Sequence, residues 1–216
     1  MAKRKRQRTK RKVGRRIPGR QDVRISVCMI ARDEEIFLTR CLDNIGESAF
    51  EILVGDTGSV DNTREVARTS GAQVFDIPWA NDFSKARNEV IDRARGDWIL
   101  VLDCDEVISR KDWDVIRKTA LSGRAVGYRI TTRNYTSSSD RAGWRPCKGE
   151  YDEEASYSGW FPTTKVRLFE KSPHIRFEGA LHELVESSIE AFGGGIADCL
   201  VPVHHYGSWK RTEPGR

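Results

Sequence analysis

Short apolar runs alternate with amphipathic stretches through the first half of the chain. The runs are nearly continuous in apolar residues, which is typical of strands that are buried on both faces. We therefore expect strands at 24–31, 50–54, 72–75 and 98–102, and helices between them at 33–45, 61–70 and 82–94. This alternation predicts an α/β fold with a mostly parallel central sheet and helices on both faces.

The second half of the chain is less regular, and its pattern predicts fewer elements. We expect a helix at 109–121 and strands at 125–132, 165–170 and 200–206. Residues 134–158 are polar and contain two glycines and a proline, so they are predicted to form a long loop. The chain is therefore expected to hold one domain at 21–216, with a regular half at 21–108 and a less regular half at 109–216.

Polar residues follow three of the predicted strands at the point where each strand ends. They form three segments, at 31–34, 55–59 and 103–106. Ligands of parallel sheets bind outside the carboxyl ends of the strands, so we expect these segments to form one site. The sequence contains neither a GxGxxG dinucleotide fingerprint nor a GxxxxGK[ST] P-loop.

Three acids crowd into the last of these segments. Asp103, Asp105 and Glu106 follow the apolar run, and their like charges repel unless a positive group lies among them. A divalent cation would supply that charge, and oxygen ligands suit Mg²⁺ or Mn²⁺, which complete their shell with water and phosphate. The alternative is a solvated acidic turn that caps the next helix, because short acidic motifs also recur by chance.

The net charge of +5 conceals two regions of opposite sign. Residues 1–20 contain eleven Lys or Arg and no acid, which leaves 26 basic and 32 acidic residues, a charge of −6, in the remainder. The first 20 residues have too few apolar side chains to offset the entropy of ordering, so we expect a disordered basic tail. Such a tail could bind nucleic acid or an anionic membrane through counterion release, or it could be solubilising only.

The cysteines and the apolar stretches indicate in which cellular compartment the protein is expected. Five scattered cysteines with no CxxC pair argue against a zinc knuckle or a disulfide framework and favour a reducing cytoplasm. The apolar stretch after the tail is too short and interrupted for a signal peptide, and no segment approaches membrane-spanning length. We therefore expect a cytoplasmic protein, with peripheral membrane attachment only through the tail.

Three stretches in the first half closely resemble motifs of the family 2 glycosyltransferases in the same order, SVCMIARDEE, EILVGDTGSVDNT and FSKARNEVIDRARGDWILVLDCDE. A resemblance to the branch of that family often fused to tetratricopeptide repeats rests on two later stretches, KVRLFEKSPHIRFEGALHELVE and HHYG. No such repeats follow, so we expect a minimal member or a fragment. The resemblance implies the Rossmann-like A-type glycosyltransferase fold, with a nucleotide-sugar-binding half at 21–108 and an acceptor half at 109–216.

Members of this family transfer a sugar from a nucleotide-sugar, usually linked to UDP, with inversion at the anomeric carbon. The residues that the resemblance places along the nucleotide are Ala31, Asp33, Glu34, Asp56, Lys85, Arg87 and Asp103. The acceptor stays open: a glycan, a lipid-linked glycan, a protein or a small molecule. Three aromatic residues of the second half could stack on sugar faces or serve only for packing, Trp144, Trp160 and Phe161.

The resemblance also implies a Mn²⁺ or Mg²⁺ ion at the DxD motif. Asp103 would face the ribose and the metal, and Asp105 would ligate the metal that bridges the diphosphate. A metal there would stabilise the negative charge that grows on the leaving diphosphate. Members with this fold often add a late histidine, which makes His205 either a third metal ligand or a structural histidine.

An inverting transfer also needs a general base on the acceptor side of the donor. Because the nucleotide occupies the first half, we expect the base in FEGALHELVE, where Glu183 and Glu178 rank ahead of His182. Glu178 and His182 would share a face if that stretch is helical. Two acids of the long loop come next, Asp152 and Glu153.

Two other interpretations belong to different classes of protein. A sugar-nucleotide nucleotidyltransferase would bind nucleotide and metal at the same strand ends, but it carries a Gly-rich, Lys-containing loop after the first strand, and ARDEE is not such a loop. A catalytically inactive, basic-tailed nucleic-acid-binding or adaptor protein could use the same fold. An intact DxD motif weighs against this second interpretation.

Overall fold

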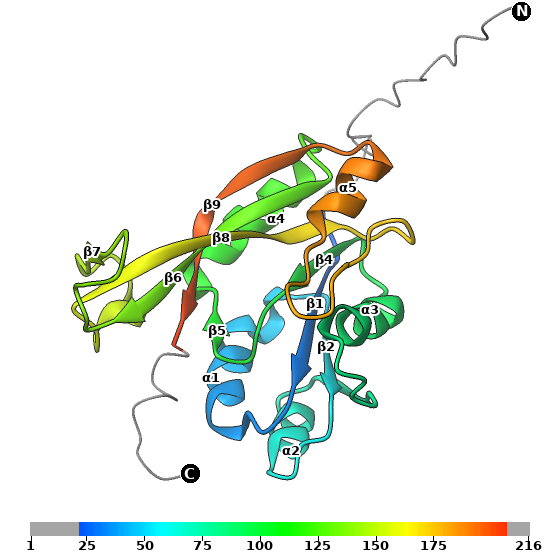
Figure 1. Ribbon diagram of the computed structural model, residues 1–216, viewed down its shortest axis with the longest axis horizontal. Coiled ribbons are helices and arrows are strands. Elements are labelled where there is room, and N and C mark those ends of the chain that lie inside the picture. Colours follow the sequence, from blue (N-terminus) through cyan, green and yellow to red (C-terminus); the bar gives the residue numbers. More distant parts are fainter. Residues whose placement is uncertain (1–21, 207–216) are drawn as a thin grey trace, which may run out of the picture.

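Strands and helices alternate through the first half of the protein, as the apolar pattern predicts (Figure 1). The computed structural model describes residues 22–206, so the predicted basic tail at 1–20 lies outside the described residues. The strands are β1 (Ile25–Ala31), β2 (Glu51–Asp56), β3 (Gln73–Asp76) and β4 (Trp98–Val101). The helices are α1 (Glu35–Ile45), α2 (Thr63–Thr69) and α3 (Phe83–Arg93), all close to their predicted bounds.

The second half differs more from the prediction. Its strands are β5 (Glu106–Val107), β6 (Gly127–Thr136), β7 (Arg145–Pro146), β8 (Gly159–Glu170) and β9 (Ile196–His205). Its helices are α4 (Trp113–Leu121) and α5 (Glu186–Phe192), and short 3₁₀ turns lie at Gly46–Ser48, Arg110–Asp112 and Asp152–Glu154. The predicted loop at 134–158 is too long, because β6 runs into it and it contains β7. The outer parts of β6 and β8 carry exposed polar residues such as Thr163 and Thr164, so they lack an apolar signal.

The strands form one mixed sheet in the order β3-β2-β1-β4-β8-β6-β9-β5, with β7 paired to β8 beside this path. β1 pairs with β2 and β4, and β2 pairs with β3, all in parallel. β8 then joins β4 and β6 in antiparallel fashion, and β9 is parallel to β6 and antiparallel to β5. The predicted α/β fold is confirmed, with a parallel first half and a mostly antiparallel second half.

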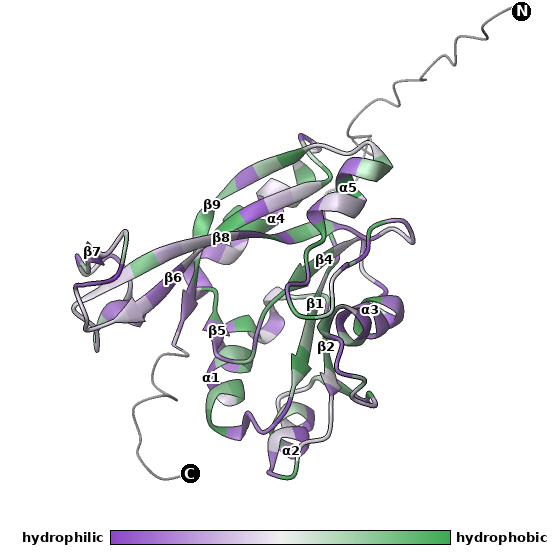
Figure 2. Cartoon of the chain, viewed as in Figure 1, coloured by the Kyte–Doolittle hydropathy of each residue, from purple (hydrophilic) through white to green (hydrophobic). Residues whose placement is uncertain are grey.

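Alternate residues of the central strands pack into two apolar cores, one on each face of the sheet. In β1, Val27 and Met29 face the core that contains α1 and α4, whereas Cys28 faces the core that contains α3 and α5. Burial on both faces explains why these strands are almost continuously apolar. Figure 2 shows the central strands largely green and the outward side of α3 purple. Within residues 22–206, no helix is long and apolar enough to cross a membrane.

Candidate active site

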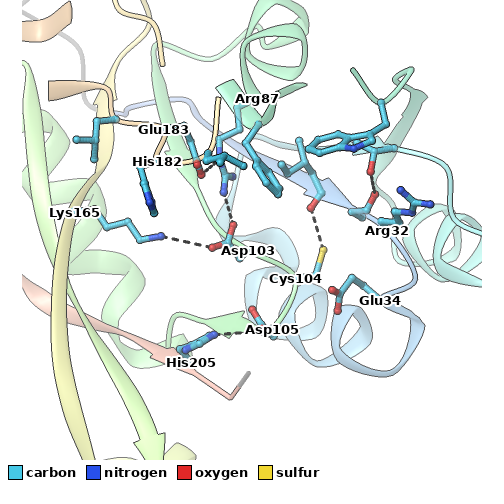
Figure 3. Close-up of a pocket in the computed structure, with 17 residues that line it drawn as sticks. Arg32, Glu34, Arg87, Asp103, Cys104, Asp105, Lys165, His182, Glu183 and His205 are labelled. Atoms are coloured by element: carbon cyan, nitrogen blue, oxygen red, sulfur yellow. Dashed lines mark hydrogen bonds and ion pairs between the residues drawn. The ribbon is translucent and has the colours of Figure 1, made fainter. Parts of the chain in front are cut away.

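A cleft of about 770 Å³ opens where β1, β2 and β4 end (Figure 3). The first half of the chain contributes Ile30, Ala31, Arg32, Glu34, Thr57, Trp79, Phe83, Arg87, Asp103, Cys104 and Asp105. The second half contributes Lys165, Leu181, His182, Glu183, Leu184 and His205. The sheet therefore brings strand ends that are far apart in the sequence to one site, as expected for ligand sites of open α/β sheets.

Eight of the predicted site residues line this cleft: Ala31, Glu34, Arg87, Asp103, Asp105, His182, Glu183 and His205. Four others do not, namely Asp33, Asp56, Lys85 and Glu178. Lys85 and Glu178 are exposed outside the cleft. Asp33 has a φ of 53°, and its carboxylate accepts a hydrogen bond from the Val60 N–H at 2.8 Å, so it joins the loops after β1 and β2.

Asp56 is buried and shapes the turn at the end of β2. Its Oδ1 accepts hydrogen bonds from the N–H groups of Gly58 at 3.1 Å and Ser59 at 3.0 Å, and it lies 2.7 Å from Nη2 of Arg64. Burial would raise the pKa of Asp56, but the hydrogen bonds from Ser59 and Gly58 and the Arg64 charge lower it overall. The ionised side chain therefore holds the turn that brings Thr57 to the cleft.

Asp103 is neutralised by cations of the protein. Nη2 of Arg87 lies 2.6 Å from Oδ1 of Asp103, and Nζ of Lys165 lies 3.8 Å from Oδ2 (Figure 3). Burial would raise the pKa of Asp103, but the charge of Arg87, with those of Arg167 and Lys165, holds it well below its usual range. The positive charge that the acidic motif requires is therefore supplied, at this residue, by Arg87 and Lys165.

Glu106 turns away from the cleft and forms a buried ion pair with Arg167, in which each side chain is only 3% exposed. Nη1 of Arg167 donates to Oε2 of Glu106 at 2.6 Å, and Nη2 donates to the other carboxylate oxygen. Oε2 also accepts the Asp103 N–H at 2.9 Å, and Arg167 donates to Oγ1 of Thr132 at 3.1 Å. Glu106 therefore fixes the acidic loop on β8 and β6.

Of the three acids in the motif, Asp105 is the one that faces a histidine, His205. Its Oδ2 lies 3.3 Å from Nε2 of His205, and Nδ1 of His205 lies 2.8 Å from Oδ1 of Asn134. An amide oxygen only accepts, so Nδ1 carries the hydrogen. Nε2 then donates a hydrogen to Asp105 when His205 is protonated, and carries a lone pair that can ligate a metal when His205 is neutral. Burial would lower the pKa of His205, but the hydrogen bond and charge of Asp105 raise it overall.

A carboxylate and an imidazole with a fixed tautomer form a pair that can ligate one metal ion. Across the described residues, no cluster of three or more His, Cys, Asp or Glu side chains is arranged to hold a metal. A site with two protein ligands suits an ion that completes its shell with water and substrate phosphates. The residues present therefore fit a divalent cation shared with a phosphorylated ligand.

Residues 177–185, here called the tongue, close one side of the cleft and are not helical. The backbones of Glu178 and Leu184 pair in antiparallel fashion, with N–H to O distances of 2.9 and 3.0 Å. Glu178 and His182 therefore do not share a helical face. Instead, Oε1 of Glu183 accepts a hydrogen bond from Nε of Arg87 at 3.0 Å, and Glu183 is the one of the three that is tied to the Asp103 network.

The three aromatic residues considered for sugar stacking, Trp144, Trp160 and Phe161, do not line the cleft. The Trp160 ring is 8% exposed, and the guanidinium carbons of Arg133 and Arg145 lie 4.7 and 5.2 Å from its centroid. Trp144 covers Gly159, where any Cβ would meet the indole at 2.3 Å. Phe161 lies beside Arg141, and none of the three aromatics lines the cleft. The two acids of the long loop that were considered as bases, Asp152 and Glu153, also lie outside it.

Sequence reasoning missed Lys165, Asn134 and the apolar rim of the cleft. Lys165 begins a predicted strand, but its contact with Asp103 follows from the antiparallel pairing of β8 with β4. Asn134 falls within the predicted loop, but in the structure it lies in β6 beside His205 of β9. The rim consists of Trp79, Phe83, Leu181 and Leu184. Phe83, Lys165, Leu181 and Leu184 lie in stretches that carry the family resemblance, but their residue types gave no sign of a place in the cleft.

The fold and the cleft define an open α/β protein whose ligand site lies at the carboxyl ends of its parallel strands. The sequence profile of glycosyl transferase family 2 matches residues 26–181. Because this match covers most of the chain, the protein belongs to that family.

Relatives and solved structures agree with this assignment. A TPR repeat-containing protein of Synechococcus elongatus is 36% identical over 77% of this chain and 36% of the relative. The SPbeta prophage-derived glycosyltransferase SunS of Bacillus subtilis is 27% identical over 74% of this chain and 34% of the relative. The chain thus spans about a third of the length of these two relatives. The first supports the resemblance to the branch that carries tetratricopeptide repeats.

Among solved structures, residues 1–349 of S. aureus TarS in complex with UDP superpose with a TM-score of 0.57 at 14% identity. The match covers 85% of this chain and 60% of that chain. At this identity the likeness concerns the fold, and it confirms the predicted Rossmann-like A-type glycosyltransferase architecture.

We predict that Arg167→Met lowers the free energy of unfolding by about 3–5 kcal/mol, because it leaves Glu106 buried and unpaired. Urea unfolding followed by circular dichroism measures this change. Arg129→Met serves as the matched control, since Arg129 pairs with Asp198 at the surface, with side chains 42% and 68% exposed. The control should change stability by less than about 1 kcal/mol. A loss no larger in Arg167→Met than in the control would contradict the structural role of the buried pair.

Proposed function

We propose that this chain is the catalytic domain of an inverting, metal-dependent glycosyltransferase that takes its sugar from a UDP-linked donor. The observation that carries the proposal is the pairing of Asp105 with His205 inside the cleft, next to the Arg87–Asp103–Lys165 cluster. Membership of glycosyl transferase family 2 supports the same reaction class. The site thus combines two side chains that can ligate a metal with cationic side chains, at the strand ends where nucleotides bind in such sheets.

The donor would lie across the ends of the parallel strands. Ala31, Glu34 and Thr57 line this part of the cleft and would flank the nucleoside, with Asp103 toward the ribose. Arg32 and Lys165 also line the cleft and would face the phosphates. TarS, which shares the fold, has been solved with UDP and with UDP-GlcNAc, and this supports a uridine nucleotide as the first donor to test.

Asp105 and His205 would hold the divalent cation. Their carboxylate oxygen and imidazole nitrogen lie side by side, and Asn134 fixes the tautomer that leaves Nε2 of His205 free to ligate. The presence of an imidazole favours Mn²⁺ over Mg²⁺, which prefers oxygen ligands. When bound, the cation would supply charge stabilisation to the leaving diphosphate. Asp103 takes no part in this pair, because Arg87 and Lys165 already neutralise it.

Glu183 would act as the general base. Its Oε1 lies 3.0 Å from Nε of Arg87, and this contact holds the carboxylate at the cleft. The acceptor proton would pass to Glu183 while the acceptor atom bonds to the anomeric carbon. The bond from that carbon to the diphosphate breaks, and its electron pair leaves with UDP. Attack from the face opposite the leaving group inverts the anomeric centre.

We predict that UDP binds at least roughly tenfold more weakly in EDTA than in Mn²⁺, because Asp105 would otherwise repel the diphosphate. Isothermal calorimetry on the wild type measures both affinities. Asp105→Asn should remove most of the gain from Mn²⁺, whereas Asp152→Asn should retain it, since Asp152 lies outside the cleft. Equal affinity for UDP with and without metal in the wild type would rule out the proposed metal site.

We predict that Glu183→Gln lowers turnover roughly 10²–10⁴-fold and leaves the affinity for UDP within a factor of about two. Release of UDP from UDP-glucose and UDP-N-acetylglucosamine provides the assay. Glu178→Gln is the matched control, because it makes the same change on the same tongue outside the cleft. If Glu183→Gln turns over like the control and His182→Asn does not, the base is His182.

A further inference from the structure

One side chain of α3, that of Asn88, forms hydrogen bonds with both the N–H and the carbonyl of one residue of the tongue, Phe177. Nδ2 of Asn88 donates to the Phe177 carbonyl at 2.9 Å, and Oδ1 of Asn88 accepts the Phe177 N–H at 3.0 Å. The amide thereby takes the place of a neighbouring strand at the residue where the tongue begins. Phe177 itself is buried, so these two backbone groups have little access to water.

Two further contacts join the tongue to the first turns of α3. The Phe83 N–H donates to the Ala180 carbonyl at 2.9 Å, and Nε of Arg87 donates to Glu183 at 3.0 Å. The Phe177 ring also packs edge-on against Phe169 of β8, with centroids 5.9 Å apart. Asn88, next to Arg87 in the sequence, therefore fixes where the tongue leaves the core, and Arg87 fixes where the Glu183 carboxylate lies.

These contacts hold the tongue at its base, its tip and its functional side chain. The contact at the base has two bonds with fixed geometry, so it sets both the position and the rotation of the backbone that carries Glu183. A loss of this contact would leave the Phe83–Ala180 hydrogen bond, the packing of the Phe177 ring and the Arg87–Glu183 ion pair as restraints. None of these three pairs with the backbone of Phe177, so the start of the tongue would be held less firmly.

We propose that Asn88 is a positioning residue for Glu183, which it places by clamping Phe177; this inference rests on the proposed function. Asn88 does not itself line the cleft, so it has no direct part in donor binding. The clamp should therefore affect the chemical step and not the affinity for the nucleotide. A positioning role requires that the loss of turnover on changing Asn88 depend on the presence of Glu183. A general contribution to stability would cause the same loss with or without Glu183.

The test compares Asn88→Ala with Glu89→Ala, a control on the same helix whose side chain forms no hydrogen bond or ion pair with another described residue. Hydrogen exchange of the tongue amides should accelerate in Asn88→Ala and not in the control. Turnover of UDP-glucose and UDP-N-acetylglucosamine should fall roughly 10- to 100-fold in Asn88→Ala, with the UDP affinity in Mn²⁺ within about twofold of the wild type. Asn88→Gln, which keeps the amide group but moves it by one methylene, is the second variant if the alanine variant is unstable, and it should change exchange and turnover in the same direction.

The decisive comparison is made in the Glu183→Gln background. There Asn88→Ala should cause no further loss of turnover, because the group that it positions is already absent. A loss of the same size in both backgrounds, or unchanged exchange of the tongue, would overturn the clamp as a positioning device. Normal turnover of Glu183→Gln alone would overturn the proposed base and Asn88 as its positioning residue, and would leave the nucleotide site standing.

Discussion

The buried ion pair between Arg167 and Glu106 is the constraint on which the site depends. Arg167 belongs to β8 and Glu106 begins β5, so the pair ties the antiparallel half of the sheet to the segment that carries the DxD motif. The same carboxylate accepts the Asp103 N–H, which sets the backbone of that motif directly. Because an unpaired charge in this position would be costly, the two halves of the cleft are held in register by electrostatics as well as by packing.

With Glu106 committed to Arg167, the two remaining acids take different roles. Asp103 is paired with Arg87 and Lys165, so its charge is already balanced within the protein. Asp105 faces His205, which is a counter-ion when protonated and a metal ligand when neutral. Cations of the protein therefore relieve the crowding of like charges at two positions, and the proposed metal would balance the charge at the third, Asp105.

The parts of this arrangement that sequence could predict are those encoded by local pattern. The buried strands and intervening helices of the first half are periodic, so the parallel sheet and the meeting of three strand ends followed from them. Which of Glu178 and Glu183 lines the cleft could not be predicted, because it depends on how Asn88 and Arg87 hold the tongue across about ninety residues of sequence. His205 was suggested only by the family resemblance, since its approach to Asp105 results from the antiparallel pairing of β9 with β5. Trp160 carried no sign that two arginines would flank it.

The central claim is that this cleft binds a nucleotide-sugar and releases its nucleotide with the help of a divalent cation. The most direct measurement is the release of nucleoside diphosphate from a panel of UDP-, GDP- and dTDP-sugars, with the full chain in Mn²⁺ and in EDTA. The account predicts release from at least one UDP-sugar in Mn²⁺ and its loss in EDTA. Release that is undiminished in EDTA, or no binding and no release with any donor in Mn²⁺, would contradict it.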